Sequence, residues 1–176
     1  MTHLEQLVTE WLDLRGYFVR CNVRVGRLSH GGHTGEIDIA AFHPPTTHCL
    51  HVECSGDANS WKVRESSFER KFAIGREFVE KEVFPWLKDP RIEQWAVVWG
   101  AGPRRKTVGR AKIVTMNMLY RNIARDIVKL NQKGNRVIPE KYPLLRTIQA
   151  TMKHVGDSKP MTARIAEDAL LLPDVE

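Results

Sequence analysis

Two strand-like runs joined by a proline-rich turn constrain the fold of this chain most strongly. The runs are "EIDIAAF" (36–42) and "HCLHVECSG" (48–56), and "HPPTT" (43–47) lies between them. A connection this short predicts antiparallel neighbours, because a parallel pair needs a long crossover. Each run places one carboxylate in an apolar segment, Asp38 in the first and Glu53 in the second. Burying a lone carboxylate is costly unless it is paired or binds a cation, so both residues need a physical reason.

The segments before these runs extend the pattern. "THLEQLVTEWLDLRG" (2–16) has apolar residues at helical spacing, with Thr2 and Glu5 as a capping box and Gly16 as its stop. "YFVRCNVRV" (17–25) alternates as a strand, and the loop "GRLSHGGHTG" (26–35) connects it to the next run. We therefore expect a helix followed by a three-stranded antiparallel meander.

The segments after them complete an α/β fold. A long amphipathic helix is predicted from residue 60 to a point before Pro85, and "EQWAVVWGA" (93–101) is typical of a strand buried on both faces. The helix allows a parallel crossover to that strand. "KIVTM" (112–116) is a fifth candidate strand, and helices are expected at 117–134, with Asn117 as cap and Gly134 as stop, and at 142–154. The expected fold class is α/β, a mixed central sheet flanked by helices, as one domain over 1–155 with a polar tail or arm at 156–176.

Side-chain alternation places Asp38 and Glu53 on the same side of the sheet if their strands pair. Two carboxylates at close range repel, and one would bind a proton at neutral pH unless a cation lies between them. Mg²⁺, with Mn²⁺ as a substitute, suits such a site because it prefers hard oxygen ligands, and the backbone carbonyl of Cys54 is an additional candidate ligand. The alternative is that both carboxylates face solvent on a half-exposed sheet and pair with arginines.

The order of these motifs resembles the PD-(D/E)XK nuclease superfamily, including members of the archaeal Holliday-junction-resolvase type. "LEQLVTEWLDLRGY" is similar to the first helix of that family, "GEIDIAAF" to its Asp strand and "HVECSG" to its (D/E)-x-K strand, over roughly residues 2–101. The resemblance implies a restriction-endonuclease-like fold. It also implies that Asp38 and Glu53 bind the metal, with Glu5 as an outer or second-metal carboxylate.

One position departs from the family pattern, since Ser55 stands where the family has its lysine. A hydroxyl cannot supply the positive charge that steadies the nucleophilic water and the scissile phosphate. Members of the superfamily can take this charge from the helix that follows, where Lys62, Arg64 and Lys71 are candidates. We place Lys62 first, because it lies at the start of that helix. The other interpretation is a degenerate site that binds without cutting.

The charge of the chain favours a polyanionic partner. The net charge is +6, and the loop "AGPRRKTVGRAK" contributes five basic residues and no acid. A solubilising surface is the alternative. The candidate nucleic-acid-binding residues are Arg24, Arg27, His30, His33, Arg104, Arg105, Lys106 and Arg110.

The remaining features bear on metal type and compartment. Five of the seven histidines fall between His30 and His51, but no pair has established zinc-site spacing, and His51 is instead a candidate partner of the acidic face. Three cysteines without CxxC spacing favour a reducing cytoplasm, and no apolar run suggests a membrane span.

The sequence thus predicts a Mg²⁺-dependent endonuclease that hydrolyses DNA phosphodiester bonds, and the resemblance implies pairing as a homodimer. One alternative is a catalytically degenerate module of the same fold that binds nucleic acid or a partner without cutting. The other is a scaffold protein whose charge is incidental.

Overall fold

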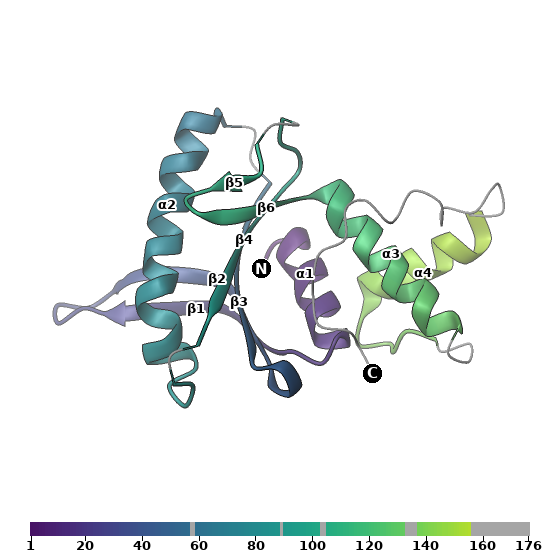
Figure 1. Ribbon diagram of the computed structural model, residues 1–176, viewed down its shortest axis with the longest axis horizontal. Coiled ribbons are helices and arrows are strands. Elements are labelled where there is room, and N and C mark those ends of the chain that lie inside the picture. Colours follow the sequence, from purple (N-terminus) through teal and green to yellow (C-terminus); the bar gives the residue numbers. More distant parts are fainter. Residues whose placement is uncertain (57–58, 89, 103–104, 133–136, 156–176) are drawn as a thin grey trace. The chain divides into compact units, whose positions relative to one another are not determined.

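The fold is described from a computed structural model, which defines residues 1–56, 59–88, 90–102, 105–132 and 137–155 (Figure 1). The described residues form two compact units, 1–115 and 116–155. The first unit contains helices α1 and α2, a π-helical turn and the whole sheet, and the second contains helices α3 and α4. In chain order the elements are α1 His3–Leu14, β1 Phe18–Arg27, β2 His33–His43, the 3₁₀ turn Pro44–Thr46, β3 His48–Ser55, α2 Trp61–Phe78, the π-helical turn Val79–Val83, β4 Ile92–Val98, β5 Thr107–Val108, β6 Ala111–Thr115, α3 Met116–Gln132 and α4 Pro143–Val155.

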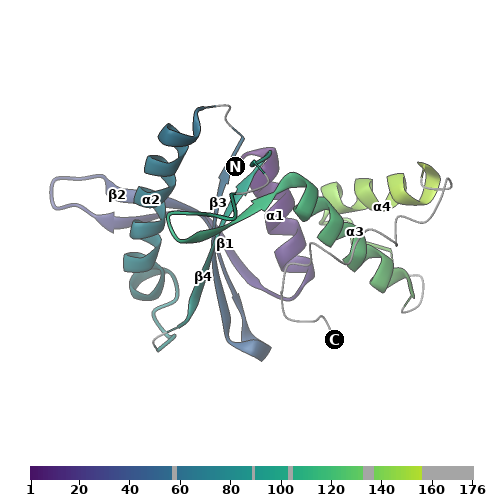
Figure 2. The same ribbon diagram turned by 45° about the horizontal axis from the view of Figure 1, so that its top comes forward.

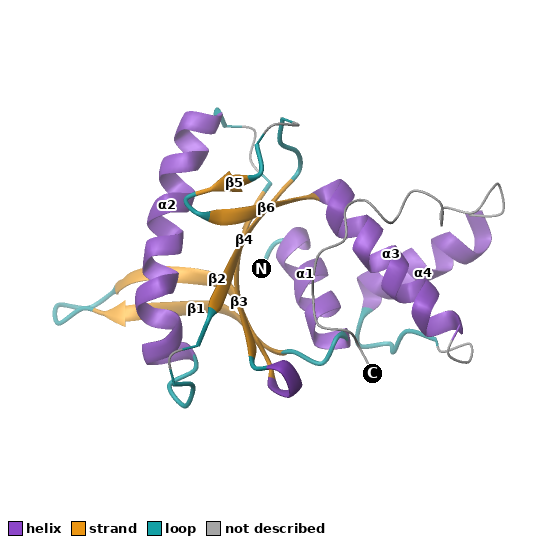
Figure 3. Ribbon diagram, viewed as in Figure 1, coloured by secondary structure: helices purple, strands orange, loops and turns teal. Residues whose placement is uncertain are grey.

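The sheet of the first unit is mixed, as the sequence predicts. Its six strands follow the order β1-β2-β3-β4-β6-β5 (Figure 3). Strands β1, β2 and β3 form the expected antiparallel meander, while β4 runs parallel to β3 and β6 parallel to β4. Helix α2 connects β3 to β4, so it supplies the predicted parallel crossover. The chain is therefore an α/β protein with a mixed six-stranded sheet.

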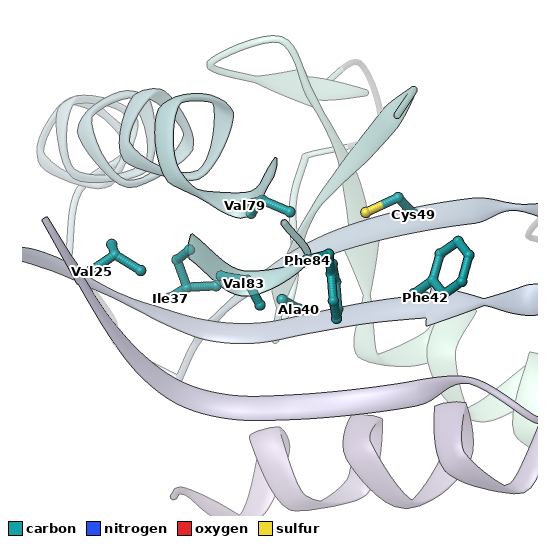
Figure 4. Packing of buried hydrophobic residues seen from close by; sticks show 8 residues of the cluster. All are labelled: Val25, Ile37, Ala40, Phe42, Cys49, Val79, Val83 and Phe84. Carbon is teal, nitrogen blue, oxygen red and sulfur yellow. The ribbon is translucent and has the colours of Figure 1, made fainter. Parts of the chain in front are cut away.

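The two helices of this unit lie on opposite faces of the sheet in both views (Figures 1 and 2). On the α1 face, Trp11 of the helix stacks on Trp95 of β4, with ring centroids 6.4 Å apart. The α2 face carries a buried cluster that joins the strands to the chain just after α2 (Figure 4). Its members are Val25, Ile37, Ala40, Phe42, Cys49, Val79, Val83 and Phe84. Both faces of the central strands are thus covered, and a polar group placed there is withdrawn from water.

The predicted basic loop contains a β-hairpin, which its basic composition does not predict. Strands β5 and β6 pair with Val108 opposite Ala111, which leaves a two-residue turn of Gly109 and Arg110. Both turn residues have positive φ, 53° and 68°, as a type I′ turn requires. The expected loop is therefore wrong over 107–111, whereas the candidate strand at 112–116 is present as β6. The glycine before Arg110 was the signal for the turn.

The second unit is a helical pair close to the prediction. Helix α3 begins at Met116 rather than at an Asn117 cap, so Asn117 lies inside its first turn. The side chain of Gln149 on α4 accepts a hydrogen bond from the backbone of Ile138 and donates one to Asn131, both at 3.0 Å. The predicted stop at Gly134 and the predicted tail at 156–176 lie outside the described residues. Among the described helices, none is both long and apolar enough to cross a bilayer.

Candidate active site

The two strand carboxylates converge on the α2 face of the sheet. Strands β2 and β3 pair with Ile39 opposite Val52 and Ala40 opposite His51, and this register continued by one residue sets Asp38 opposite Glu53. The backbone N–H of Asp38 donates to Glu53 Oε1 at 3.4 Å, and the N–H of Cys54 donates to Asp38 Oδ2 at 2.9 Å. Both residues are buried, Glu53 completely. The alternative of carboxylates facing solvent is therefore wrong.

A lysine from α2 lies between the two carboxylates. Lys71 Nζ is 3.0 Å from Asp38 Oδ1, 3.2 Å from Asp38 Oδ2 and 2.5 Å from Glu53 Oε2. Its side chain retains 30% exposure, so the ammonium reaches the buried carboxylates from the solvent side. Lys62, the candidate placed first, is instead exposed in the first turn of α2. The lysine that contacts the carboxylates thus lies about two and a half turns further along the helix than Lys62.

The pKa values in this cluster separate the two acids. Burial raises the pKa of Asp38 to about 6, and the charge of Glu53 adds to the rise against the opposing effects of Lys71 and the Cys54 amide. Burial alone would raise the pKa of Glu53, but the hydrogen bonds from His51 and Lys71, together with the charge of Lys71, outweigh it and lower that pKa. Burial opposes the charge of Lys71, yet the two carboxylates raise its pKa to about 12. The cluster therefore holds one firmly ionised acid, one firmly charged lysine and one acid that titrates near pH 6.

A buried histidine completes the surroundings of Glu53. His51 Nε2 lies 2.7 Å from Glu53 Oε1, and His51 Nδ1 lies 3.0 Å from the side-chain amide of Gln94. His51 and Gln94 are neighbours across the parallel β3–β4 pair. The sequence predicts His51 beside the acidic face, but it gave no signal for Gln94, because that contact depends on the β3–β4 register.

Glu5 is engaged at the start of α1. Its carboxylate accepts from the backbone N–H of Thr2 at 2.9 Å, while the Thr2 hydroxyl accepts from the N–H of Glu5 at 3.3 Å. The predicted capping box is thus confirmed. Within the described part of the chain, no group of three or more His, Cys, Asp or Glu side chains is arranged to hold a metal ion. A role for Glu5 as an outer or second-metal carboxylate stays a prediction.

The other expected site residues lie on or beside β3. Ser55 is half-buried at the end of the strand, opposite Val98 of β4. Cys54 contributes its backbone N–H to Asp38, and burial together with the nearby acids raises the pKa of its thiol well above the usual range. The carbonyl of Cys54 as a metal ligand stays a prediction.

Most of the candidate nucleic-acid-binding residues in the described chain are exposed. Arg24 pairs with Glu36 at 3.6 Å on the β1–β2 hairpin. Arg105 pairs with Glu65 at 3.3 Å and lies over the Trp61 ring, 4.7 Å from its centroid, so its charge is partly engaged. Arg104 lies outside the described residues. The exposed candidates are Arg24, Arg27, His30, His33, Lys106 and Arg110.

Comparisons with known proteins give little further information. No protein-family model and no curated protein matches the chain. A solved structure, the crystal structure of a protein of unknown function called AF1548, aligns with 86% of this chain and 96% of its own chain. The two are 13% identical and superpose with a TM-score of 0.39, a likeness that carries no argument about function.

Proposed function

We propose that this chain is a divalent-cation-dependent deoxyribonuclease of the PD-(D/E)XK superfamily, with a restriction-endonuclease-like fold, that hydrolyses DNA phosphodiester bonds beside Asp38 and Glu53. The position of Lys71 carries the proposal, because its ammonium lies 3.0 Å from Asp38 and 2.5 Å from Glu53. The chemistry of this superfamily needs two carboxylates and a lysine. Here α2 supplies the lysine that β3 lacks at Ser55.

The order of elements around the cluster also supports the proposal. A helix, an antiparallel meander, a crossover helix and a parallel strand follow one another, with Asp38 on the second strand and Glu53 on the third. This order is the one that the resemblance in the sequence implies.

The donor set fits Mg²⁺ or Mn²⁺. Asp38 and Glu53 offer hard carboxylate oxygens at one place, and the Lys71 ammonium between them indicates that the place favours a cation. When bound, such an ion orients and acidifies water and offsets the negative charge that develops on the phosphate. The chain's own contribution is Lys71, whose positive charge can stabilise a phosphate oxygen during in-line attack.

The exposed basic residues account for substrate binding in this proposal. Arg27, Lys106 and Arg110 lie on the loops and hairpins of the sheet unit and can contact phosphates without reading base sequence. Cutting both strands of a duplex would then use two copies of the chain.

A second function is favoured by the same contacts. The ammonium of Lys71 contacts both carboxylates, so the cluster contains a counter-charge without a metal ion. In that case the chain is a catalytically degenerate module that binds DNA or a partner. Ser55→Lys separates the two functions: new nicking by this variant of an otherwise inactive protein would identify the degenerate module.

Cleavage of supercoiled plasmid tests the leading proposal. We expect nicking with Mg²⁺ or Mn²⁺, none with EDTA, and none by Asp38→Asn. Glu36→Gln is the matched control, because it neutralises an exposed carboxylate on the same strand. Nicking that persists in EDTA or in Asp38→Asn would refute the assignment.

A further inference from the structure

His51 is enclosed by the fold, although imidazoles are usually found at least partly exposed. The side chain has no solvent exposure, and its ring packs edge-on against Phe72 of α2 with centroids 5.3 Å apart. Both ring nitrogens have partners, Glu53 on one side and Gln94 on the other. The ring therefore connects the candidate site to a strand that carries none of its acids.

The hydrogen-bond partners of Gln94 determine which ring nitrogen of His51 carries the proton. Gln94 Nε2 donates to the backbone carbonyl of Phe72 at 2.9 Å, and Gln94 Oε1 accepts from Arg76 at 2.8 Å. This amide cannot be reversed without losing both bonds, so its N–H₂ group must face His51 Nδ1. Nδ1 is then an acceptor, and the ring proton is on Nε2, where it is donated to Glu53 Oε1.

Gly75 provides the space for this ring. It lies inside α2, where glycine weakens a helix relative to alanine. A Cβ atom at this position would overlap the His51 imidazole. The helix thus carries a residue of low helix propensity at the position where a side chain would overlap His51.

We propose that His51 is a positioning residue for Glu53. The Nε2–H group of His51 donates to Oε1 of Glu53. Oε2 is then the carboxylate oxygen that faces the cation. That cation is the Lys71 ammonium here, 2.5 Å from Oε2, and a divalent ion in the proposed function on which this inference rests.

Divalent-ion binding is the first test, with Mn²⁺ alone titrated calorimetrically into the metal-free protein. His51→Leu removes the 2.7 Å side-chain contact to Oε1 and leaves that oxygen only the longer 3.4 Å bond from the Asp38 N–H. Mn²⁺ binding should weaken about 10- to 100-fold, as the loss of an outer hydrogen bond to a ligand does. His51→Gln keeps an N–H near the Nε2 position and should retain most of the affinity. His48→Leu, on the same strand outside this contact, is the control. Equal Mn²⁺ affinity in wild type and His51→Leu would overturn the inference while leaving the proposed function intact.

Two further measurements do not depend on metal. Nitrogen-15 NMR of the imidazoles should show His51 protonated on Nε2 alone, and a proton on Nδ1 would overturn the inference. Gly75→Ala should lower the melting temperature of the wild-type protein but raise that of His51→Ala, because the overlap is then gone. If Gly75→Ala lowers the melting temperature in both backgrounds, the space that Gly75 leaves is not required by the His51 ring. If wild type binds no Mn²⁺, the proposed function fails, and the NMR result decides whether His51 orients Glu53.

Discussion

Lys71 of α2 and Glu53 of β3 form an ion pair in which the ammonium lies 2.5 Å from a completely buried carboxylate oxygen. The same ammonium is 3.0 Å from Asp38. Three charged groups from three elements therefore meet at one point of the α2 face. This relationship explains how the sheet can bury two acids, and it also sets up a competition between the lysine and any metal ion.

Lys71→Met should increase the affinity of the site for Mn²⁺. The ammonium occupies the space between the two carboxylates, so a divalent ion must displace it or bind against its charge. We expect at least about tenfold tighter binding in the variant, equivalent to about 1.4 kcal/mol of removed repulsion. Calorimetric titration measures this, with Lys62→Met as the exposed control on the same helix. Unchanged or weaker binding in Lys71→Met would show that the lysine and the metal do not share this place.

The raised pKa of Asp38 predicts a pH-dependent stability. Because its folded-state pKa of about 6 lies above the ordinary value of 3.8, the folded chain binds the proton more tightly. Ionised Asp38 therefore destabilises the fold, with no effect below pH about 4 and the full cost above pH about 6. The shift corresponds to about 3 kcal/mol.

Asp38→Asn removes this titration. The free energy of unfolding of the variant relative to wild type should rise by up to about 3 kcal/mol between pH 4 and pH 7. Urea denaturation across that range measures the difference. A difference that does not change with pH, or that falls, would contradict the burial of Asp38 in this cluster.

The fold and half of the site follow from local sequence. Strand alternation and a short Pro-Pro turn are enough to place Asp38 and Glu53 on the same side of the sheet, and the capping-box pattern correctly identifies Thr2 and Glu5 at the start of α1. These features depend on residues close together in the chain or on a period that the chain itself displays.

The rest depends on tertiary register. Lys62 and Lys71 are both lysines of the same predicted helix. Which of them reaches the carboxylates depends on how α2 packs on the sheet. The contact between His51 and Gln94 likewise requires the parallel pairing of β3 with β4. The β5–β6 hairpin was missed because its basic composition suggested a loop, although Gly109 marked a turn.

Arg110→Asn should stabilise the chain and weaken DNA binding. Arg110 has a φ of 68°, a left-handed conformation that costs most L-residues about 1–2 kcal/mol and that asparagine tolerates better. We expect a gain of about 0.5–1 kcal/mol in the free energy of unfolding. If Arg110 contacts a phosphate, the plot of log affinity against log salt should lose about one unit of slope. Lys106→Asn, in the same hairpin region, is the control, and it should reduce the slope of the salt dependence without the gain in stability. If Arg110→Asn is more stable but has an unchanged slope, Arg110 does not contact DNA.

The most direct test of the central claim is the rate of plasmid nicking by Lys71→Met at saturating Mg²⁺, compared with Lys62→Met. If Lys71 supplies the positive charge that Ser55 cannot, its loss should slow nicking by about 10²- to 10³-fold. Lys62→Met should nick at the wild-type rate. Wild-type nicking by Lys71→Met, or an equal loss in Lys62→Met, would contradict the assignment of Lys71 to the active site.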